Sequence, residues 1–255
     1  MPAEIRAFRC LDDNIGVLIR DPESGACAAV DAPEEAPIVA ALEEAGWTLT
    51  DILVTHRHAD HIGGIEALKA RTGCRVVAPR KALGQVPAVD LFVGEGDVVE
   101  VGGLRAQVFE TPGHCSDHVS YWFEDERVLF CADTLFTLGC GRVLEGSYGD
   151  LWTSLQRLAA LPGETRVYSG HDYVLSNGRF ALAADPDNAA LKARMAEAER
   201  ARAEGRFLIP STIADEAATN PFLRAGEPAL ARSVKREGAS ASEVFAALRE
   251  WKNRF

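Results

Sequence analysis

The stretch Thr55-His56-Arg57-His58-Ala59-Asp60-His61 places four side chains that can bind a metal within six residues. It follows Ile52-Leu53-Val54, a short apolar run typical of a buried strand. Apolar residues then recur at three-residue steps at Ile62, Ile65 and Leu68, a pattern typical of a helix that begins just after the motif. We therefore expect the motif to lie on a strand-to-helix loop.

The spacing inside the motif suits metal binding. On an extended segment His56 and His58 can point to the same side, while the turn into the helix lets Asp60 and His61 point to a second position nearby. Imidazole nitrogen and carboxylate oxygen are ligands that zinc and similar metals accept. One solvated surface histidine would be unremarkable, but four potential ligands this close together favour a metal site.

Three single residues elsewhere in the chain extend this set. His114 and His171 each follow an apolar run at the end of an expected strand, and Asp133 ends a third such run. Loops at strand ends can converge on one rim of a sheet. The sixth histidine, His118, is expected to have a structural role outside the site.

The rest of the chain predicts a mixed domain followed by a helical one. Apolar runs separated by turn residues predict hairpins over residues 17–30, 98–109 and 119–131. Helical spacing occurs over 37–46 and 151–161, with one more strand at 166–170. Helical patterns dominate after residue 175, over 187–205, 212–218 and 240–252. We expect a catalytic domain over residues 1–174 and a helical domain over residues 175–255.

Composition excludes several functional classes. A formal net charge of -11 lacks the basic footprint that nucleic-acid binding needs. The first residues resemble no secretory leader, and no apolar run is long enough to cross a membrane. The six cysteines are scattered singly, so we expect reduced thiols and a cytoplasmic protein.

The metal-binding pattern resembles that of the metallo-beta-lactamase fold superfamily, in which His-x-His-x-Asp-His is followed by single His, Asp and His ligands. The resemblance implies a four-layered αββα sandwich, of the α+β class. It also implies two metal sites: His56, His58 and His114 would hold one metal, Asp60, His61 and His171 the other, and Asp133 would bridge both.

Within this superfamily the chain is most similar to glyoxalase II, the hydroxyacylglutathione hydrolases. The resemblance covers nearly the whole chain, including the helical tail, and rests on Thr111-Pro112-Gly113-His114, Ala132-Asp133-Thr134-Leu135-Phe136, Gly139-Cys140-Gly141-Arg142, Gly170-His171-Asp172-Tyr173 and Thr219-Asn220-Pro221-Phe222-Leu223-Arg224. It implies hydrolysis of S-(2-hydroxyacyl)glutathione, typically S-D-lactoylglutathione, to glutathione and a 2-hydroxy acid, as in methylglyoxal detoxification.

The same resemblance implies which residues contact glutathione: Arg142, Tyr173, Arg249 and Lys252. Six basic residues exceed three acidic ones by three over positions 232–255, so an acidic protein has a basic tail. Cations there suit the carboxylates of glutathione. Two positions depart from the family pattern: Arg57 stands where many relatives have another His, and Leu144 where some have a substrate-contacting Tyr.

The expected mechanism is hydrolysis by a metal-activated hydroxide. Two bound divalent metals, zinc with iron or manganese as alternatives, would lower the pKa of water from about 15.7 to about 7. Asp60 is the expected catalytic residue, orienting the nucleophile while also binding metal. The expected partner is a small glutathione thioester, and we expect a monomer.

Three alternatives remain on sequence grounds. An iron-dependent glutathione persulfide dioxygenase on the same scaffold would use one metal and fewer ligands, which the second ligand set and the helical tail disfavour. A beta-lactamase would be exported, whereas we expect no leader here because the first residues resemble none. Purely structural metals would be closed off by four protein ligands, whereas a shared carboxylate with open positions suits catalysis.

Overall fold

The computed structural model describes residues 1–255 and divides into two compact units. The N-terminal unit comprises Met1–Glu110 and Asp117–Ala132, and the C-terminal unit comprises Thr111–Ser116 and Asp133–Phe255. The chain therefore passes between the units after residues 110, 116 and 132. No helix in the chain is both long and apolar enough to cross a lipid bilayer.

The first sheet of the N-terminal unit is mixed. Its strands follow in sequence order: β1 (Glu4–Cys10), β2 (Asn14–Arg20), β3 (Cys27–Val30), β4 (Asp51–Leu53), β5 (Arg75–Pro79) and β6 (Leu91–Val93). Strands β1 to β3 pair antiparallel, and β3 to β6 pair parallel. The parallel strands are joined by α1 (Glu35–Ala45), α2 (Ala59–Ile62), α3 (Ile65–Thr72) and the short 3-10 helix η1 (Arg80–Ala82).

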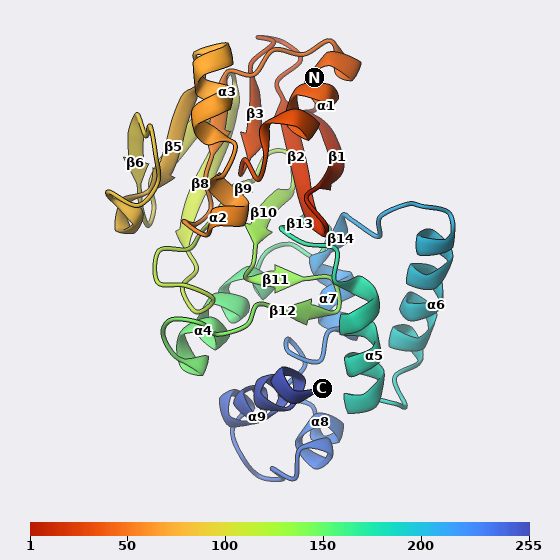
Figure 1. Ribbon diagram of the computed structural model, residues 1–255. Coiled ribbons are helices and arrows are strands. Elements are labelled where there is room, and N and C mark those ends of the chain that lie inside the picture. The colour runs from red at the N-terminus through yellow and green to blue at the C-terminus, as the bar shows by residue number, and fades with distance from the viewer. The chain divides into compact units, whose positions relative to one another are not determined.

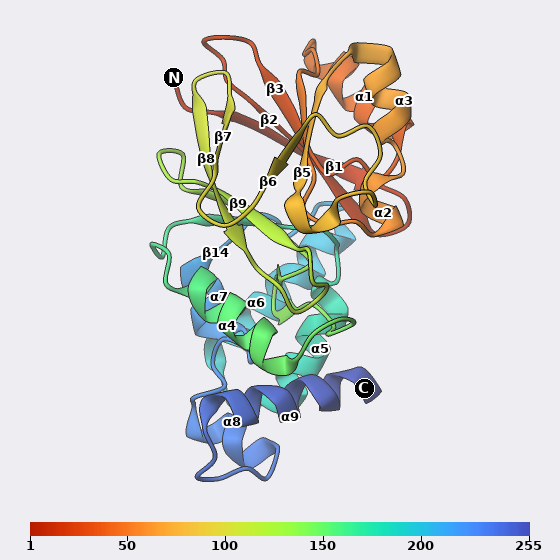
Figure 2. The ribbon, with the colours of Figure 1, turned by 90° about the vertical axis from the view of Figure 1, so that its left-hand side faces the viewer.

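The second sheet of this unit is an antiparallel meander of β7 (Val98–Val101), β8 (Leu104–Glu110), β9 (Val119–Phe123) and β10 (Val128–Ala132). Figures 1 and 2 show the two sheets face to face, with α1 and α3 covering the outer face of the first. The three hairpins predicted over 17–30, 98–109 and 119–131 are confirmed.

Side-chain alternation explains why the central strands of the first sheet are buried on both faces. Ile52 and Val76 belong to the core beneath α1 and α3, together with Ile38 and Leu68 from those helices. Successive side chains on a strand point to opposite faces. Leu53, fully buried but outside that core, therefore lies on the face turned toward the second sheet.

The helix after β4 begins earlier than its apolar spacing predicts. We expected it just after the motif, but α2 starts at Ala59, so Asp60 and His61 lie in its first turn. His56 and His58 stay in the preceding extended loop. Asp60 suits this position because an acidic side chain is favoured near the positive end of a helix.

The C-terminal unit is mostly helical. Its helices are α4 (Tyr148–Ala159), α5 (Val174–Ala184), α6 (Ala189–Ala203), α7 (Ile213–Thr219), α8 (Pro228–Ser233) and α9 (Ala241–Arg254). Two small antiparallel pairs accompany them: β11 (Leu135–Phe136) with β12 (Gly139–Cys140), and β13 (Arg166–Ser169) with β14 (Ser211–Thr212). The helical tail is confirmed, and α5 and α8 are helices that the sequence patterns did not predict.

Aromatic packing fixes the last helix, α9. The ring of its Phe245 lies 5.4 Å from that of Trp152 on α4 and 5.9 Å from that of Phe222, and Trp251 lies 5.2 Å from Phe180 on α5. The helix begins with a capping box in which Ser240 and Glu243 bind each other's backbone N–H groups. These contacts hold the basic side chains of α9 in place.

Candidate metal centre and substrate cleft

Asp31 organises the metal-binding motif in the N-terminal unit. It directly follows β3, and because β3 and β4 are parallel, it lies beside Thr55 at the same end of the sheet. Its carboxylate accepts hydrogen bonds from the Thr55 backbone N–H at 2.7 Å and from the Thr55 hydroxyl at 2.8 Å. It also accepts one from His61 Nδ1 at 2.7 Å. Asp31 is 5% exposed, so these contacts are shielded from water.

These contacts determine which ring nitrogens face a metal. The hydroxyl proton of Thr55 is donated to Asp31, so the hydroxyl accepts from His56 Nδ1 at 3.0 Å. With both Nδ1 atoms acting as donors, His56 and His61 each keep a lone pair on Nε2. His56 Nε2 lies 3.0 Å from His58 Nδ1, which brings two candidate ligand atoms together.

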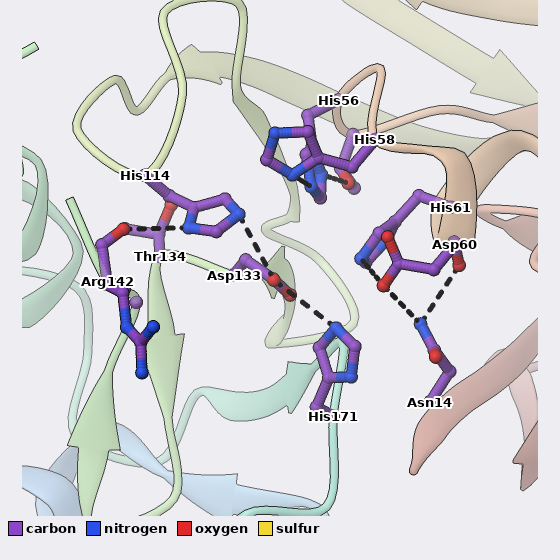
Figure 3. Close-up of polar contacts among 12 residues, drawn as sticks. Asn14, His56, His58, Asp60, His61, His114, Asp133, Thr134, Arg142 and His171 are labelled. Carbon is purple, nitrogen blue, oxygen red and sulfur yellow. Dashed lines mark hydrogen bonds and ion pairs between the residues drawn. The ribbon is translucent and has the colours of Figure 1, made fainter. Parts of the chain in front are cut away.

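Asp60 is held from a second direction. Asn14, at the start of β2, donates from Nδ2 to the Asp60 backbone oxygen at 3.0 Å and to its Oδ2 at 3.2 Å (Figure 3). The same Oδ2 lies 3.5 Å from His61 Nε2. The carboxylate side chain is 42% exposed, so one side of it is open to solvent.

In the C-terminal unit, Asp133 lies between two imidazoles. Its Oδ2 is 3.4 Å from His114 Nε2 and 3.4 Å from His171 Nε2 (Figure 3). His114 Nδ1 donates to the Arg142 backbone oxygen at 2.9 Å, which leaves Nε2 as the candidate ligand atom. All three residues are buried.

A glycine permits this close packing. A Cβ on Gly141 would lie 1.9 Å from the Asp133 backbone oxygen and 3.3 Å from the His114 Cβ. No larger residue fits there without moving Asp133. The segment Gly139-Cys140-Gly141-Arg142 therefore positions the backbone around two candidate ligands.

Each unit thus carries histidine and aspartate groups whose donor atoms suit a divalent metal. His56, His58, Asp60 and His61 come together in the N-terminal unit, and His114, Asp133 and His171 in the C-terminal unit. Asp31 and Asn14 were not singled out from the sequence. Asp31 directly follows the apolar run at residues 28–30, but only the structure shows that this strand pairs with the one that leads into the motif.

A cleft of 210 Å³ in the C-terminal unit brings together all four residues predicted to contact glutathione. Its lining is Phe136, Cys140, Arg142, Tyr173, Ser176, Asn177, Arg249 and Lys252. The ring of Tyr173 stacks on that of His171, with centroids 4.9 Å apart and planes 3° apart. The cleft therefore adjoins one of the candidate ligands.

Two cations of this cleft, Arg249 and Lys252, have different surroundings. Arg249 is buried and donates from Nη1 to the Cys140 backbone oxygen at 2.9 Å, so it also ties α9 to β12. Burial, followed by the charge of Arg249, lowers the pKa of Lys252 to about 8. Leu144 is 56% exposed and does not line the cleft.

The basic residues of the tail line two different clefts. Lys235, Arg236 and Arg254 line a separate cleft of 470 Å³ on another face of α9. The excess of basic residues in the tail is therefore not all directed at the cleft that holds Arg249 and Lys252.

The chain is similar in sequence to known proteins over nearly its whole length. Residues 24–171 match the model of the metallo-beta-lactamase superfamily, and residues 172–255 match that of the hydroxyacylglutathione hydrolase C-terminus. The chain is 66% identical over 99% of both lengths to a hydroxyacylglutathione hydrolase of Methylobacterium nodulans. It is 56% identical over 100% of both lengths to one of Rhodopseudomonas palustris.

A solved structure gives the same fold. The crystal structure of ETHE1 from Myxococcus xanthus matches with a TM-score of 0.70 and 30% identity, covering 97% of this chain and 90% of the other. The predicted metallo-beta-lactamase fold with a C-terminal helical domain is confirmed.

Proposed function

The chain belongs to the hydroxyacylglutathione hydrolases, metallo-hydrolases of the metallo-beta-lactamase superfamily, and we propose that it hydrolyses S-(2-hydroxyacyl)glutathione to glutathione and a 2-hydroxy acid. S-D-lactoylglutathione is the proposed typical substrate, and methylglyoxal detoxification the proposed role. The observation that carries the proposal is the cleft in which Arg142, Tyr173, Arg249 and Lys252 meet beside His171.

We assign two divalent metals to the seven donors. His56, His58 and His114 would hold one metal, Asp60, His61 and His171 the other, and Asp133 would contact both. The oriented Nε2 atoms and the position of Asp133 between two imidazoles support this assignment. Five imidazoles with two carboxylates fit zinc, which we propose, and also accept iron or manganese.

When bound, such metals supply a hydroxide near neutral pH and polarise the thioester carbonyl. The protein supplies orientation. Asp60, fixed by Asn14 and open on one side, would accept a hydrogen bond from the attacking water and aim it. The departing thiolate needs little proton donation, because an ordinary thiol has a pKa of about 8.5.

The cleft would hold the glutathione part of the substrate. Arg142 and Lys252 would bind its carboxylates, and Tyr173 would pack beside the reacting end of the substrate because its ring already lies on His171. Arg249 would contribute charge while keeping its bond to Cys140. We propose a catalytic domain over residues 1–174 and a glutathione-binding domain over residues 175–255.

We also propose a cytoplasmic monomer. The six cysteines are all free and buried. This suits a reducing compartment where disulfides are rare.

The KM for the thioester is expected to rise by up to about tenfold between pH 7 and pH 9, with little change in kcat. The pKa of Lys252 is about 8, so the fraction of ammonium form falls about tenfold over this range. Steady-state kinetics across the range would measure this. Lys252→Met should show a raised KM that is flat with pH, and Arg254→Met, on the same helix but lining the other cleft, should behave as wild type. A pH-independent KM in the wild type would contradict the role of Lys252.

The test of the function itself compares two substrates on metal-loaded protein. We expect thioester hydrolysis with S-D-lactoylglutathione, followed as loss of the thioester, and no oxygen consumption with glutathione persulfide. Oxygen consumption without thioester hydrolysis would replace the proposal with a persulfide dioxygenase. Metal analysis of the same sample would identify the bound ions.

A further inference from the structure

Three consecutive residues before and at the start of β9 contact three consecutive residues of the metal-binding motif, in antiparallel order. The Val119 backbone N–H donates to the Thr55 backbone oxygen at 2.9 Å. The ring of His118 stacks on that of His56, with centroids 4.9 Å apart and planes 25° apart. Asp117 accepts hydrogen bonds from Arg57. We call residues 117–119 the clamp.

The contact between Asp117 and Arg57 combines hydrogen bonds with an ion pair. The Asp117 carboxylate accepts the Arg57 backbone N–H at 3.0 Å, and its other oxygen forms an ion pair with the Arg57 guanidinium. The side chain of Asp117 is 0% exposed and that of Arg57 is 18% exposed. A buried carboxylate is costly unless it is paired and hydrogen-bonded, so its position is tightly defined.

Arg57 is the residue between two candidate metal ligands. Asp117 binds both the backbone N–H and the side chain of Arg57, which restricts the backbone on either side of Arg57. The direction of that backbone decides where His56 and His58 point. His56 is also restricted through its ring, which hydrogen-bonds to Thr55 at Nδ1 and packs on His118. One step earlier, the Tyr121 hydroxyl donates to the Val54 backbone oxygen at 2.8 Å, so the antiparallel contacts continue up the chain.

We propose that the clamp pre-forms the metal-binding loop, with Asp117 and Arg57 as positioning residues for His56 and His58 and with His118 as packing support. The inference rests on the proposed function only in that the loop binds metal. It assigns a role to two residues that the sequence left without one: Arg57, which had been only a departure from the family pattern, and His118, which we expected to lie outside the site. His118 is indeed no ligand candidate, but it packs directly on one.

Zinc affinity, measured by competition with a chelator, tests the clamp without substrate. Asp117→Asn and Arg57→Met should each bind zinc about 10- to 100-fold more weakly than wild type, the range typical when a group that orients a ligand is lost. The absorption bands of the cobalt-loaded variants should also shift, since they report ligand geometry. The matched controls are Asp51→Asn and Arg75→Met, an ion pair at the opposite end of β4 with its carboxylate also buried, and they should bind zinc as wild type does.

A double variant separates the loss of ligand positioning from the cost of leaving the buried Asp117 carboxylate unpaired. Arg57→Met leaves a buried carboxylate without its cation, whereas Arg57→Met with Asp117→Asn removes both charges and should fold even if the single variant does not. Weak zinc binding in the double variant supports the clamp. Wild-type zinc affinity in the double variant or in Asp117→Asn, or an equal loss in the Asp51→Asn control, overturns it. If wild-type protein binds zinc but hydrolyses no thioester, the proposed function fails and the clamp does not.

Discussion

Metal-free protein is expected to hydrolyse S-D-lactoylglutathione at least about a thousandfold more slowly than metal-loaded protein. Polarising the carbonyl and generating hydroxide at neutral pH together account for several kcal/mol of the barrier, and about 1.4 kcal/mol corresponds to a factor of ten in rate. The described residues offer no substitute for the metals in these two roles. Asp60, the carboxylate proposed to orient the nucleophile, can position a water but cannot lower its pKa from about 15.7.

Dialysis against a chelator, followed by initial-rate measurement before and after zinc is added back, would check this. Zinc should restore the rate, whereas magnesium should not, because magnesium prefers oxygen ligands and five of the seven proposed donors are imidazoles. Thermal unfolding of the metal-free sample should still be cooperative, which would show that the fold survives. Equal rates with and without metal would refute the mechanism.

Replacing Asp31 with alanine is expected to weaken metal binding about 10- to 100-fold and to lower the free energy of unfolding by about 3–5 kcal/mol. The change leaves three donors without their acceptor: the Thr55 backbone N–H, the Thr55 hydroxyl and His61 Nδ1. Each buried donor that loses its partner costs about 1–3 kcal/mol. The loss also frees the rings of His56 and His61, because the proton on Thr55 is no longer directed at Asp31.

A matched control separates the two effects. Asp21, which directly follows β2 and whose backbone N–H donates to Ala26 just before β3, is also buried and accepts hydrogen bonds from Glu23, Ser24 and Gly103. Asp21→Ala should destabilise the protein to a similar extent in urea unfolding but leave zinc affinity unchanged. If both variants lost metal equally, Asp31 would be a stability residue and not an organiser of the motif.

Local sequence patterns were sufficient to predict the elements whose partners lie close by in the chain. The alternation and turns of the β7/β8 and β9/β10 pairs predict hairpins, because an antiparallel neighbour joined by a tight turn needs only nearby sequence. The parallel strands β5 and β6 were missed. A parallel strand needs a distant partner, and its short apolar run does not differ from other buried segments.

The residues of the candidate site also fall into two groups: those that the sequence could predict and those that it could not. The seven proposed ligands could be named from the sequence because their residue types and motifs are distinctive, and the four cleft residues because the family resemblance implies them. Asp31, Asn14 and the Arg57–Asp117 pair could not. Each acts through a partner 24 to 60 residues away along the chain, and nothing in the local sequence indicates such a partner.

The sequence by itself indicated metal-dependent chemistry through a dense histidine and aspartate motif after a buried strand, with further candidate ligands after three other strands. The tertiary structure alone decided which nitrogen of His61 and of His114 would face a metal. That depends on what the other nitrogen donates to, and the acceptors, Asp31 and the Arg142 carbonyl, come from other elements. It also decided that the cations of the basic tail separate, because the helix of α9 turns Lys252 and Arg254 toward different clefts.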